Sequence, residues 1–175
     1  QTAGWFMPGG TRNRLELYRT LPTLDIVQKS GASGTDYEDY VSNTPDSEYF
    51  RSLDFVRSSD RFDIPAIYID SWYDFGVAET LKLFNQMREN AVSQEARDNQ
   101  YVIITPSTHC AWSRARVPMR AGARDVGDWQ LDFNDMYLRW YRHWLDKADN
   151  GITDMPRVQY YLMGANEWRS SETWP

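Results

Sequence analysis

The chain has 175 residues, of which 41% are hydrophobic and 25% charged, a composition typical of a globular domain with its own core. Its formal net charge of −6, with no marked cluster of Lys or Arg, argues against a nucleic-acid-binding surface. No apolar run approaches the roughly 18 residues that a membrane span needs, and the single cysteine, Cys110, excludes an internal disulfide.

Residues 1–60 predict short helices joined by loops, because their apolar residues do not alternate as those of a strand do. Two groups recur at helical spacing: Tyr37, Tyr40 and Val41, and Tyr49, Phe50 and Leu53. Residues 30–34 consist of serine, glycine and alanine and form a loop by composition. Nothing in this part of the sequence predicts a sheet.

The pattern changes at residue 64 and predicts a βαβ unit. Residues 64–69 form a short, nearly continuous apolar run, typical of a strand buried on both faces. Polar and aromatic residues follow, and a helix is then predicted from apolar residues three or four apart: Val77, Leu81, Phe84 and Met87. A second apolar run at 101–104 leads to His109. Because the two strands flank a helix, we expect them to be parallel.

The remaining residues predict one more helix and one more strand. Residues 111–128 are rich in Arg, Gly and Asp and are expected to run over the surface. The helix that follows has one broad apolar stripe, composed of Met136, Tyr137, Trp140, Tyr141, Trp144 and Leu145, and Asn150-Gly151 is expected to end it. Residues 157–163 form a strand with no evident partner. Two parallel strands are too few for a stable sheet, so we expect a piece of a larger protein.

Two residues with acid–base chemistry follow the predicted parallel strands. In open parallel sheets the reactive groups lie beyond the carboxyl ends of the strands, where Asp74 and His109 are found. A carboxylate there can accept a hydrogen bond from one imidazole nitrogen, which leaves the other nitrogen to take a proton from a serine. The acid precedes the histidine, as it does in α/β-hydrolases. Position alone leaves Asp70, the first polar residue after the strand, as an equal alternative to Asp74.

Four segments resemble the X-prolyl dipeptidyl peptidase and cocaine esterase family of α/β-hydrolases. Residues 64–74, which end in Ser-Trp-Tyr-Asp, are similar to the family segment that carries the acid. Residues 105–109, Thr-Pro-Ser-Thr-His, are similar to the segment that carries the histidine. Residues 147–152 and 163–169 resemble further family segments in the same order. The resemblance favours Asp74 over Asp70 as the acid.

The resemblance implies a serine-dependent acyl hydrolase that acts on a small-molecule ester or amide and needs no cofactor. Asp74 and His109 would be catalytic, and the serine would come from the missing N-terminal part of the enzyme, upstream of Gln1. The expected fold is α/β, the C-terminal part of an α/β-hydrolase with a parallel sheet. Its expected domains are part of a helical cap (1–60), the hydrolase domain (61–152) and the start of a jelly-roll-like β-sandwich (153–175). Four aromatic residues are candidates for lining the substrate pocket: Trp72, Tyr73, Phe75 and Trp112.

The chain departs from the family pattern around both segments. Ser71 and Thr105 stand where the family usually has glycine, and Ser107-Thr108 replaces a pair that bears tryptophan. Some family members that cleave α-amino acid esters carry further carboxylates directly after the acid. Residues 75–77, Phe-Gly-Val, offer none, which argues against specificity for amino esters.

Other candidates have simpler explanations. Ser33 lies in a glycine-containing loop that lacks the full G-x-S-x-G pattern and follows no strand, so it is not expected to be the nucleophile. Cys110 is expected to be a small packed residue, and His143 a surface residue. Two histidines without closely spaced acidic ligands give no metal signature. A non-catalytic α/β-hydrolase-like binding protein is the alternative function, and self-association into a homo-oligomer stays open.

Overall fold

The computed structural model describes residues 14–31, 35–53, 56–113 and 119–175. The chain divides into two compact units, Gln1–Arg57 and Ser58–Pro175, and each is described by itself. Ser33 lies outside the described residues.

The described part of the first unit, residues 14–31, 35–53 and 56–57, contains short helical segments. They are α1 (Arg14–Leu17), η1 (Thr23–Asp25), α2 (Ile26–Ser30), α3 (Tyr37–Ser42) and α4 (Glu48–Ser52). Ser47 caps α4, because its hydroxyl accepts a hydrogen bond from the amide of Phe50 at 3.4 Å. Ile26 and Val27 of α2 are buried. These short helices agree with the pattern predicted for residues 1–60, whereas their assignment to a cap stays a prediction.

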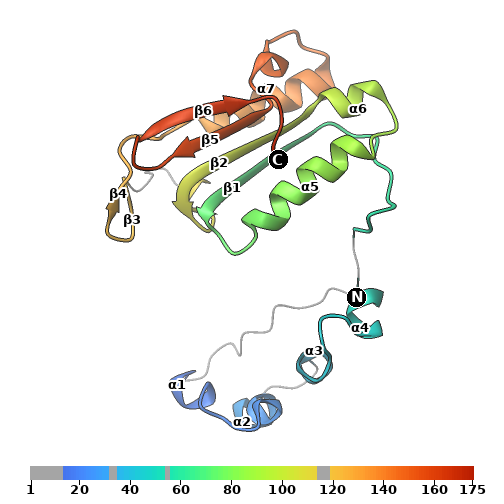
Figure 1. Cartoon of the computed structure of the whole chain (residues 1–175), viewed down its shortest axis with the longest axis vertical. Coiled ribbons are helices and arrows are strands. Elements are labelled where there is room, and N and C mark those ends of the chain that lie inside the picture. The colour runs from blue at the N-terminus through green and yellow to red at the C-terminus, as the bar shows by residue number, and fades with distance from the viewer. Residues whose placement is uncertain (1–13, 32–34, 54–55, 114–118) are drawn as a thin grey trace. The chain divides into compact units, whose positions relative to one another are not determined.

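The second unit is built on a four-stranded sheet in the order β1-β2-β5-β6 (Figure 1). β1 (Ala66–Tyr73), β2 (Gln100–Thr108) and β5 (Val158–Leu162) are parallel, and β6 (Glu167–Ser171) is antiparallel to β5. The predicted βαβ unit is confirmed: α5 (Val77–Glu89) and α6 (Gln94–Asp98) connect β1 to β2. The other elements are η2 (Ala111–Ser113), β3 (Arg120–Ala121), β4 (Arg124–Asp125), α7 (Phe133–Asp146) and η3 (Ile152–Asp154).

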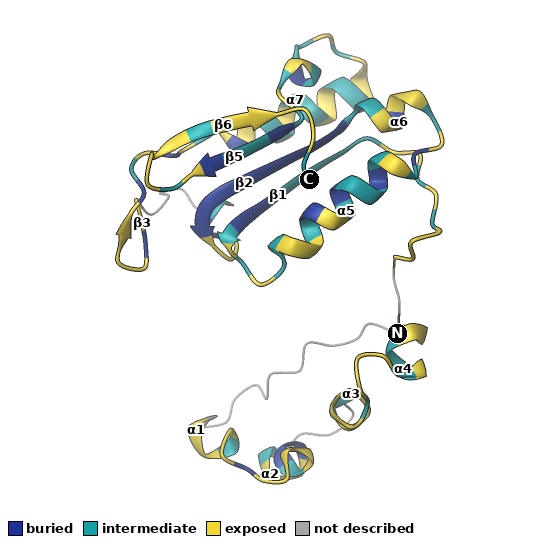
Figure 2. Ribbon diagram, in the orientation of Figure 1, coloured by how far each residue is buried: buried dark blue, intermediate teal, exposed yellow. Residues whose placement is uncertain are grey.

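Apolar side chains pack on both faces of the sheet, and β2 is therefore buried along nearly all of its length (Figure 2). On one face, Leu81 and Phe84 of α5 pack with Val102, Ile104 and Val158. On the other face, Phe133 of α7 packs with Ile103, Trp129 and Tyr161. Each large apolar side chain buried in this way contributes about 1.5–3 kcal/mol. Burial on both faces explains why residues 101–104 read as an unbroken apolar run.

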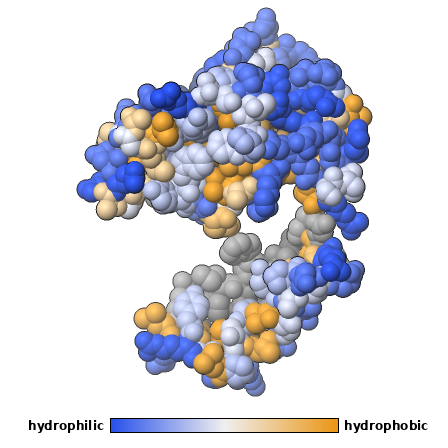
Figure 3. Space-filling view, in the orientation of Figure 1, coloured by the Kyte–Doolittle hydropathy of each residue, from blue (hydrophilic) through white to orange (hydrophobic). Residues whose placement is uncertain are grey.

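The face of the second unit that is visible in Figure 3 is mainly hydrophilic, with smaller apolar patches. α5 shows the reason, because it turns Leu81, Phe84 and Met87 into the core and leaves Glu79 and Lys82 at the surface.

Residues 153–175 add two strands, β5 and β6, to the sheet, and the expected start of a β-sandwich there stays a prediction. β5 pairs with β2 in the parallel sheet, with Val102 opposite Val158, and β6 pairs with β5 from Val158–Ser171 to Leu162–Glu167. The strand that had no evident partner in the sequence therefore has one on each side. An apolar strand pattern reports burial but does not identify the neighbouring strand, which here precedes it by more than fifty residues.

The stripe predicted on α7 is only partly buried. Phe133 is buried, and Met136, Tyr137, Trp140 and Trp144 are half-buried, but Tyr141 and Leu145 are 59% and 74% exposed. The helix begins at an N-cap, where the side chain of Asp132 accepts from the amide of Asp135 at 2.9 Å. It ends at Lys147, whose left-handed conformation (φ 59°) stops the helix before Asn150-Gly151. His143 is half-buried, with Nδ1 3.0 Å from the carbonyl oxygen of Ala148.

Candidate active site

The register of the sheet brings the predicted acid and base together. β1 extends beyond the predicted strand and ends at Tyr73, which is paired with Thr108, the last residue of β2. Because the two strands are parallel, the residues that directly follow them lie at the same edge of the sheet. Those residues are Asp74 and His109.

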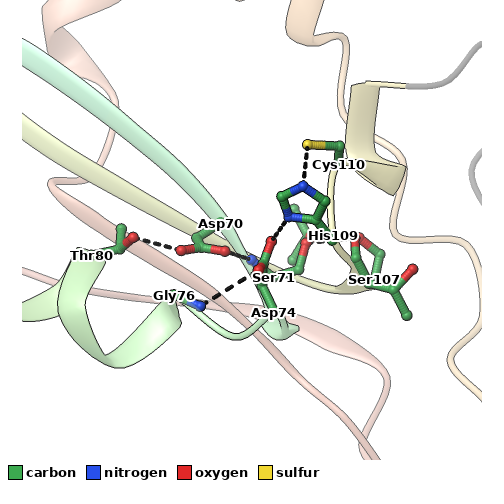
Figure 4. Close-up of polar contacts among 10 residues, drawn as sticks. Asp70, Ser71, Asp74, Gly76, Thr80, Ser107, His109 and Cys110 are labelled. Carbon is green, nitrogen blue, oxygen red and sulfur yellow. Dashed lines mark hydrogen bonds and ion pairs between the residues drawn. The ribbon is translucent and has the colours of Figure 1, made fainter. Parts of the chain in front are cut away.

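Asp74 and His109 contact each other directly. Oδ2 of Asp74 lies 2.8 Å from Nδ1 of His109 (Figure 4). The Asp74 side chain is only 9% exposed, whereas that of His109 is 62% exposed. The amide of Gly76 lies 3.5 Å from Oδ1 of Asp74, and the amide of Asp74 donates to the carbonyl oxygen of Ser71 at 2.9 Å. The carboxylate is therefore held from its own loop while the imidazole projects outward.

Asp70, the alternative acid, has a different set of partners. Its Oδ1 accepts from the amide of Ser71 at 2.7 Å, and its Oδ2 accepts from the hydroxyl of Thr80 at 2.5 Å. Asp70 is 7% exposed and points toward α5, away from His109 (Figure 4). It joins β1 to the first turn of α5, where the helix dipole favours a negative charge.

Cys110 lies on the other side of the imidazole. Its Sγ is 3.5 Å from Nε2 of His109, and its backbone adopts a positive φ of 55°, which is uncommon for a residue other than glycine. The sharp turn that this conformation makes places the thiol beside the nitrogen that does not face Asp74. The sequence predicted only a small packed residue here, but Cys110 is exposed.

The four aromatic candidates for the pocket lie in two kinds of environment. The ring of Phe75, 71% exposed, packs against His109 with centroids 5.1 Å apart, and Tyr73 is 49% exposed. Trp72 instead donates from Nε1 to the carbonyl oxygen of Tyr161 at 2.9 Å and packs against Trp174. Trp112 packs against Phe133 and Tyr137 of α7. Only Phe75 therefore has a described ring contact with the pair, and the pocket role of all four stays a prediction.

Ser71, Thr105 and Ser107 depart from the family pattern, and their sequence alone predicted no role for them. The structure brings their hydroxyl groups together directly before Asp74 and His109. Each of the three oxygens lies 2.8–2.9 Å from the other two. The sequence did contain a signal for this cluster. Three hydroxyl residues stand within two short segments, at positions where the family usually has glycine or a pair that bears tryptophan.

A separate polar cavity of about 440 Å³ lies away from this pair. Tyr101 at the start of β2, Arg157 just before β5 and Glu172 just after β6 line it, which places it near the amino ends of the parallel strands. Arg157 is ion-paired there with Asp98 and Glu172, each at 3.5 Å. Arg157 is thus held by two carboxylates of the lining, and the cavity is not the candidate active site.

No group of three or more His, Cys, Asp or Glu side chains is placed to hold a metal ion among the described residues. Within the same residues, no helix has the length and apolarity needed to cross a bilayer.

Sequence comparisons connect the chain to esterases. Cocaine esterase of a Rhodococcus species is 25% identical over 138 residues, which cover 78% of this chain and 23% of that protein. Two proteins that carry serine-esterase names, from Mycobacterium bovis and Mycobacterium tuberculosis, are each 31% identical over 112 residues. That match covers 63% of this chain and 16% of each of them. The chain thus spans less than a quarter of the length of these relatives, and no family model matches it.

Structural comparison supports the fold. The chain resembles the crystal structure of an aminopeptidase from a marine sediment archaeon, Thaumarchaeota archaeon, with a TM-score of 0.64 at 19% identity. The match covers 98% of this chain and 28% of that one. The mixed α/β architecture with a mostly parallel sheet is consistent with an α/β-hydrolase-like fold. Over part of its length, the chain is thus similar in sequence to cocaine esterase-like acyl esterases.

Proposed function

We propose that this chain supplies the acid and the base of a serine-dependent acyl hydrolase that cleaves a small-molecule ester or amide. The observation that carries the proposal is the contact between Asp74 and His109 at the carboxyl edge of the parallel sheet, 2.8 Å between Oδ2 and Nδ1. The esterase names of the related proteins support the same reaction class.

The geometry suits the division of labour in a catalytic triad. With its proton on Nδ1, His109 donates a hydrogen bond to the carboxylate of Asp74, which fixes the tautomer and leaves Nε2 as an acceptor. Nε2 can then take the proton of a serine hydroxyl as the serine attacks the carbonyl carbon. The same nitrogen returns the proton to the leaving group, and a water molecule completes hydrolysis of the acyl-enzyme by the same route.

The nucleophile of this proposal lies upstream of the chain. Ser71 and Ser107 are close to the pair, but they are 0% and 3% exposed and their hydroxyls bond to each other. Neither can reach a substrate in this arrangement. A serine from the preceding part of the protein, approaching Nε2 from the exposed side of His109, would complete the triad.

The same proposal includes the surroundings of the site. Residues 1–60 would form part of a helical cap, and residues 153–175 would begin a jelly-roll-like β-sandwich. Phe75 and Tyr73 would line the pocket with apolar surface. The absence of a carboxylate in residues 75–77 favours an acyl group without a free ammonium.

Fluorophosphonate labelling of the longer protein tests the proposal directly. The expected result is one labelled serine upstream of Gln1, with labelling lost in His109→Ala and reduced about 10³-fold or more in rate in Asp74→Asn. His143→Ala is the matched control, because His143 bonds to Ala148 at the end of α7, and it should label at the parental rate.

A folded protein that takes no label at all would overturn the proposal and favour a non-catalytic binding protein of the same fold. A labelled serine whose rate falls less than about tenfold in His109→Ala would retain the hydrolase but remove His109 from its mechanism.

A further inference from the structure

We propose that the hydroxyl groups of Ser71, Thr105 and Ser107 form a positioning device that fixes Asp74 relative to His109. The three hydroxyls lie on neighbouring strands, Ser71 on β1 and the other two on β2. The kinetic part of this proposal rests on the proposed acyl hydrolase function, whereas the positioning part concerns the Asp74–His109 contact and is independent of activity.

The three hydroxyls form a closed ring in the interior. Ser71 Oγ lies 2.8 Å from Thr105 Oγ1 and 2.9 Å from Ser107 Oγ, and the last two are 2.9 Å apart. Ser71 and Thr105 are 0% exposed and Ser107 is 3% exposed. A hydroxyl has one proton to donate and can accept more than one, so a ring of three bonds uses each donor once. The ring satisfies its own polar groups without water.

The ring lies where the register of the two strands changes. Ser71 is paired with Thr105, and the next pair is Tyr73 with Thr108, so β2 has one more residue than β1 in this interval. Ser107 lies in that interval. Ser71 thus bonds to β2 both before the irregularity and within it. An extra residue of this kind redirects the side chains that follow it, and such irregularities are common next to active sites.

The register at this point decides where the base points. Tyr73 and Thr108 are followed immediately by Asp74 and His109, so a slip of one residue would turn His109 toward the other face. Ser71 connects the ring to the acid through its backbone, because its carbonyl oxygen accepts from the amide of Asp74 at 2.9 Å. Its amide donates to Asp70, which is tied to α5 through Thr80.

Stability and positioning can be separated experimentally. Removing one hydroxyl leaves the other buried hydroxyls short of a partner, whereas removing all three leaves no hydroxyl of the ring unsatisfied and costs only the long 3.4 Å bond from Ser107 to the carbonyl oxygen of Thr108. A purely structural role predicts that the full apolar replacement restores everything that a single replacement loses. A positioning role predicts that it restores stability but not the geometry of the Asp74–His109 contact.

The experiment compares three variants of the longer protein. Thr105→Val removes the hydroxyl and keeps the shape, and Thr105→Ser keeps the hydroxyl and removes the methyl group. The triple variant Ser71→Ala, Thr105→Val, Ser107→Ala replaces the whole ring. The readouts are the thermal midpoint, kcat and KM, and the downfield NMR resonance of the Nδ1 proton, assigned by its loss in His109→Ala.

We expect Thr105→Val to lose or shift the downfield resonance and to lower kcat about 10- to 100-fold, the cost of misplacing a reacting group. KM should stay within about twofold, since substrate contacts are unchanged. Thr105→Ser should retain both the resonance and kcat. The triple variant should melt near the parental temperature and still lack the resonance.

A parental resonance and parental kcat in both Thr105→Val and the triple variant would overturn the proposal. If Thr105→Val does not fold, the triple variant alone decides by the same criterion. If the parent hydrolyses no ester or amide and labels no serine, the proposed function fails, but the resonance still reports whether the ring positions the pair.

Discussion

The side chain of Asp74 is only 9% exposed, whereas the side chain of His109, which it contacts, is 62% exposed. This asymmetry follows from their places in the fold. Asp74 is enclosed by its own loop, whose Gly76 amide faces Oδ1, whereas His109 projects beyond the end of β2. A fixed acid beside an accessible base is the arrangement that proton transfer to and from a substrate requires.

Asp70 and Asp74 offer a matched pair of substitutions. We expect Asp74→Asn to lower kcat about 10³-fold or more with little loss of stability, because an amide cannot hold the same imidazole tautomer. Asp70→Asn should have the opposite profile, losing about 1–2 kcal/mol through its bonds to Ser71 and Thr80, with kcat within tenfold of the parent. Urea denaturation and steady-state kinetics on both proteins check this. A reversed profile would make Asp70 the acid.

Cys110 provides a test of the nucleophile. Its thiol lies 3.5 Å from Nε2 of His109, so a thiol hydrolase would also need this residue. We expect Cys110→Ser to keep most of the hydrolytic rate and its fluorophosphonate labelling upstream, because the proposed nucleophile is a serine. Complete loss of activity, together with alkylation of Cys110 that inactivates the parent, would assign the attack to the thiol.

Substitutions of Phe75 and Trp72 distinguish a side chain that lines the pocket from one that packs in the core. Phe75→Ala should leave the free energy of unfolding within about 0.5 kcal/mol, since the ring is 71% exposed, but should raise KM. Trp72→Phe should cost about 1 kcal/mol or more through the lost bond to Tyr161, with KM unchanged. KM and denaturation curves for the two variants check the pair. An increase in KM for Trp72→Phe would instead show that Trp72 contributes to the substrate pocket.

Tyr68 predicts an alkaline limit to stability. Burial raises the pKa of Tyr68 from 10.0 to about 12. The contribution of this raised pKa to the free energy of unfolding is complete below pH 10. It is lost as the pH rises toward 12, because the unfolded chain releases the proton first. Tyr68→Phe should remove this part of the decline, apart from a constant offset for the bond to Gln100 at 3.3 Å. Denaturation at pH 8 to 11.5 compares the parent with Tyr68→Phe. If the free energy of unfolding falls with pH equally in both, Tyr68 is not a source of the decline.

Much of the second unit was predictable because its signals are local. Residues 101–104 form the unbroken apolar run that is typical of a strand buried on both faces. Leu81, Phe84 and Met87 recur at the helical period and are buried. The order of strand, helix and strand implies parallel pairing, and chain order together with a short family motif pointed to Asp74 and His109. Each of these inferences needs only neighbouring residues and the rules of secondary structure.

Tertiary structure alone decided the relations between distant segments. The direct contact between Asp74 and His109 depends on the register of β1 against β2, including one irregularity that no periodicity reveals. The pairing of β5 with β2 and the outward face of α7 depend on which surfaces meet in space. The hydroxyl ring joins residues 34 and 36 positions apart. A sequence pattern records whether a side chain is buried, but the choice of partner follows from packing the whole sheet at once.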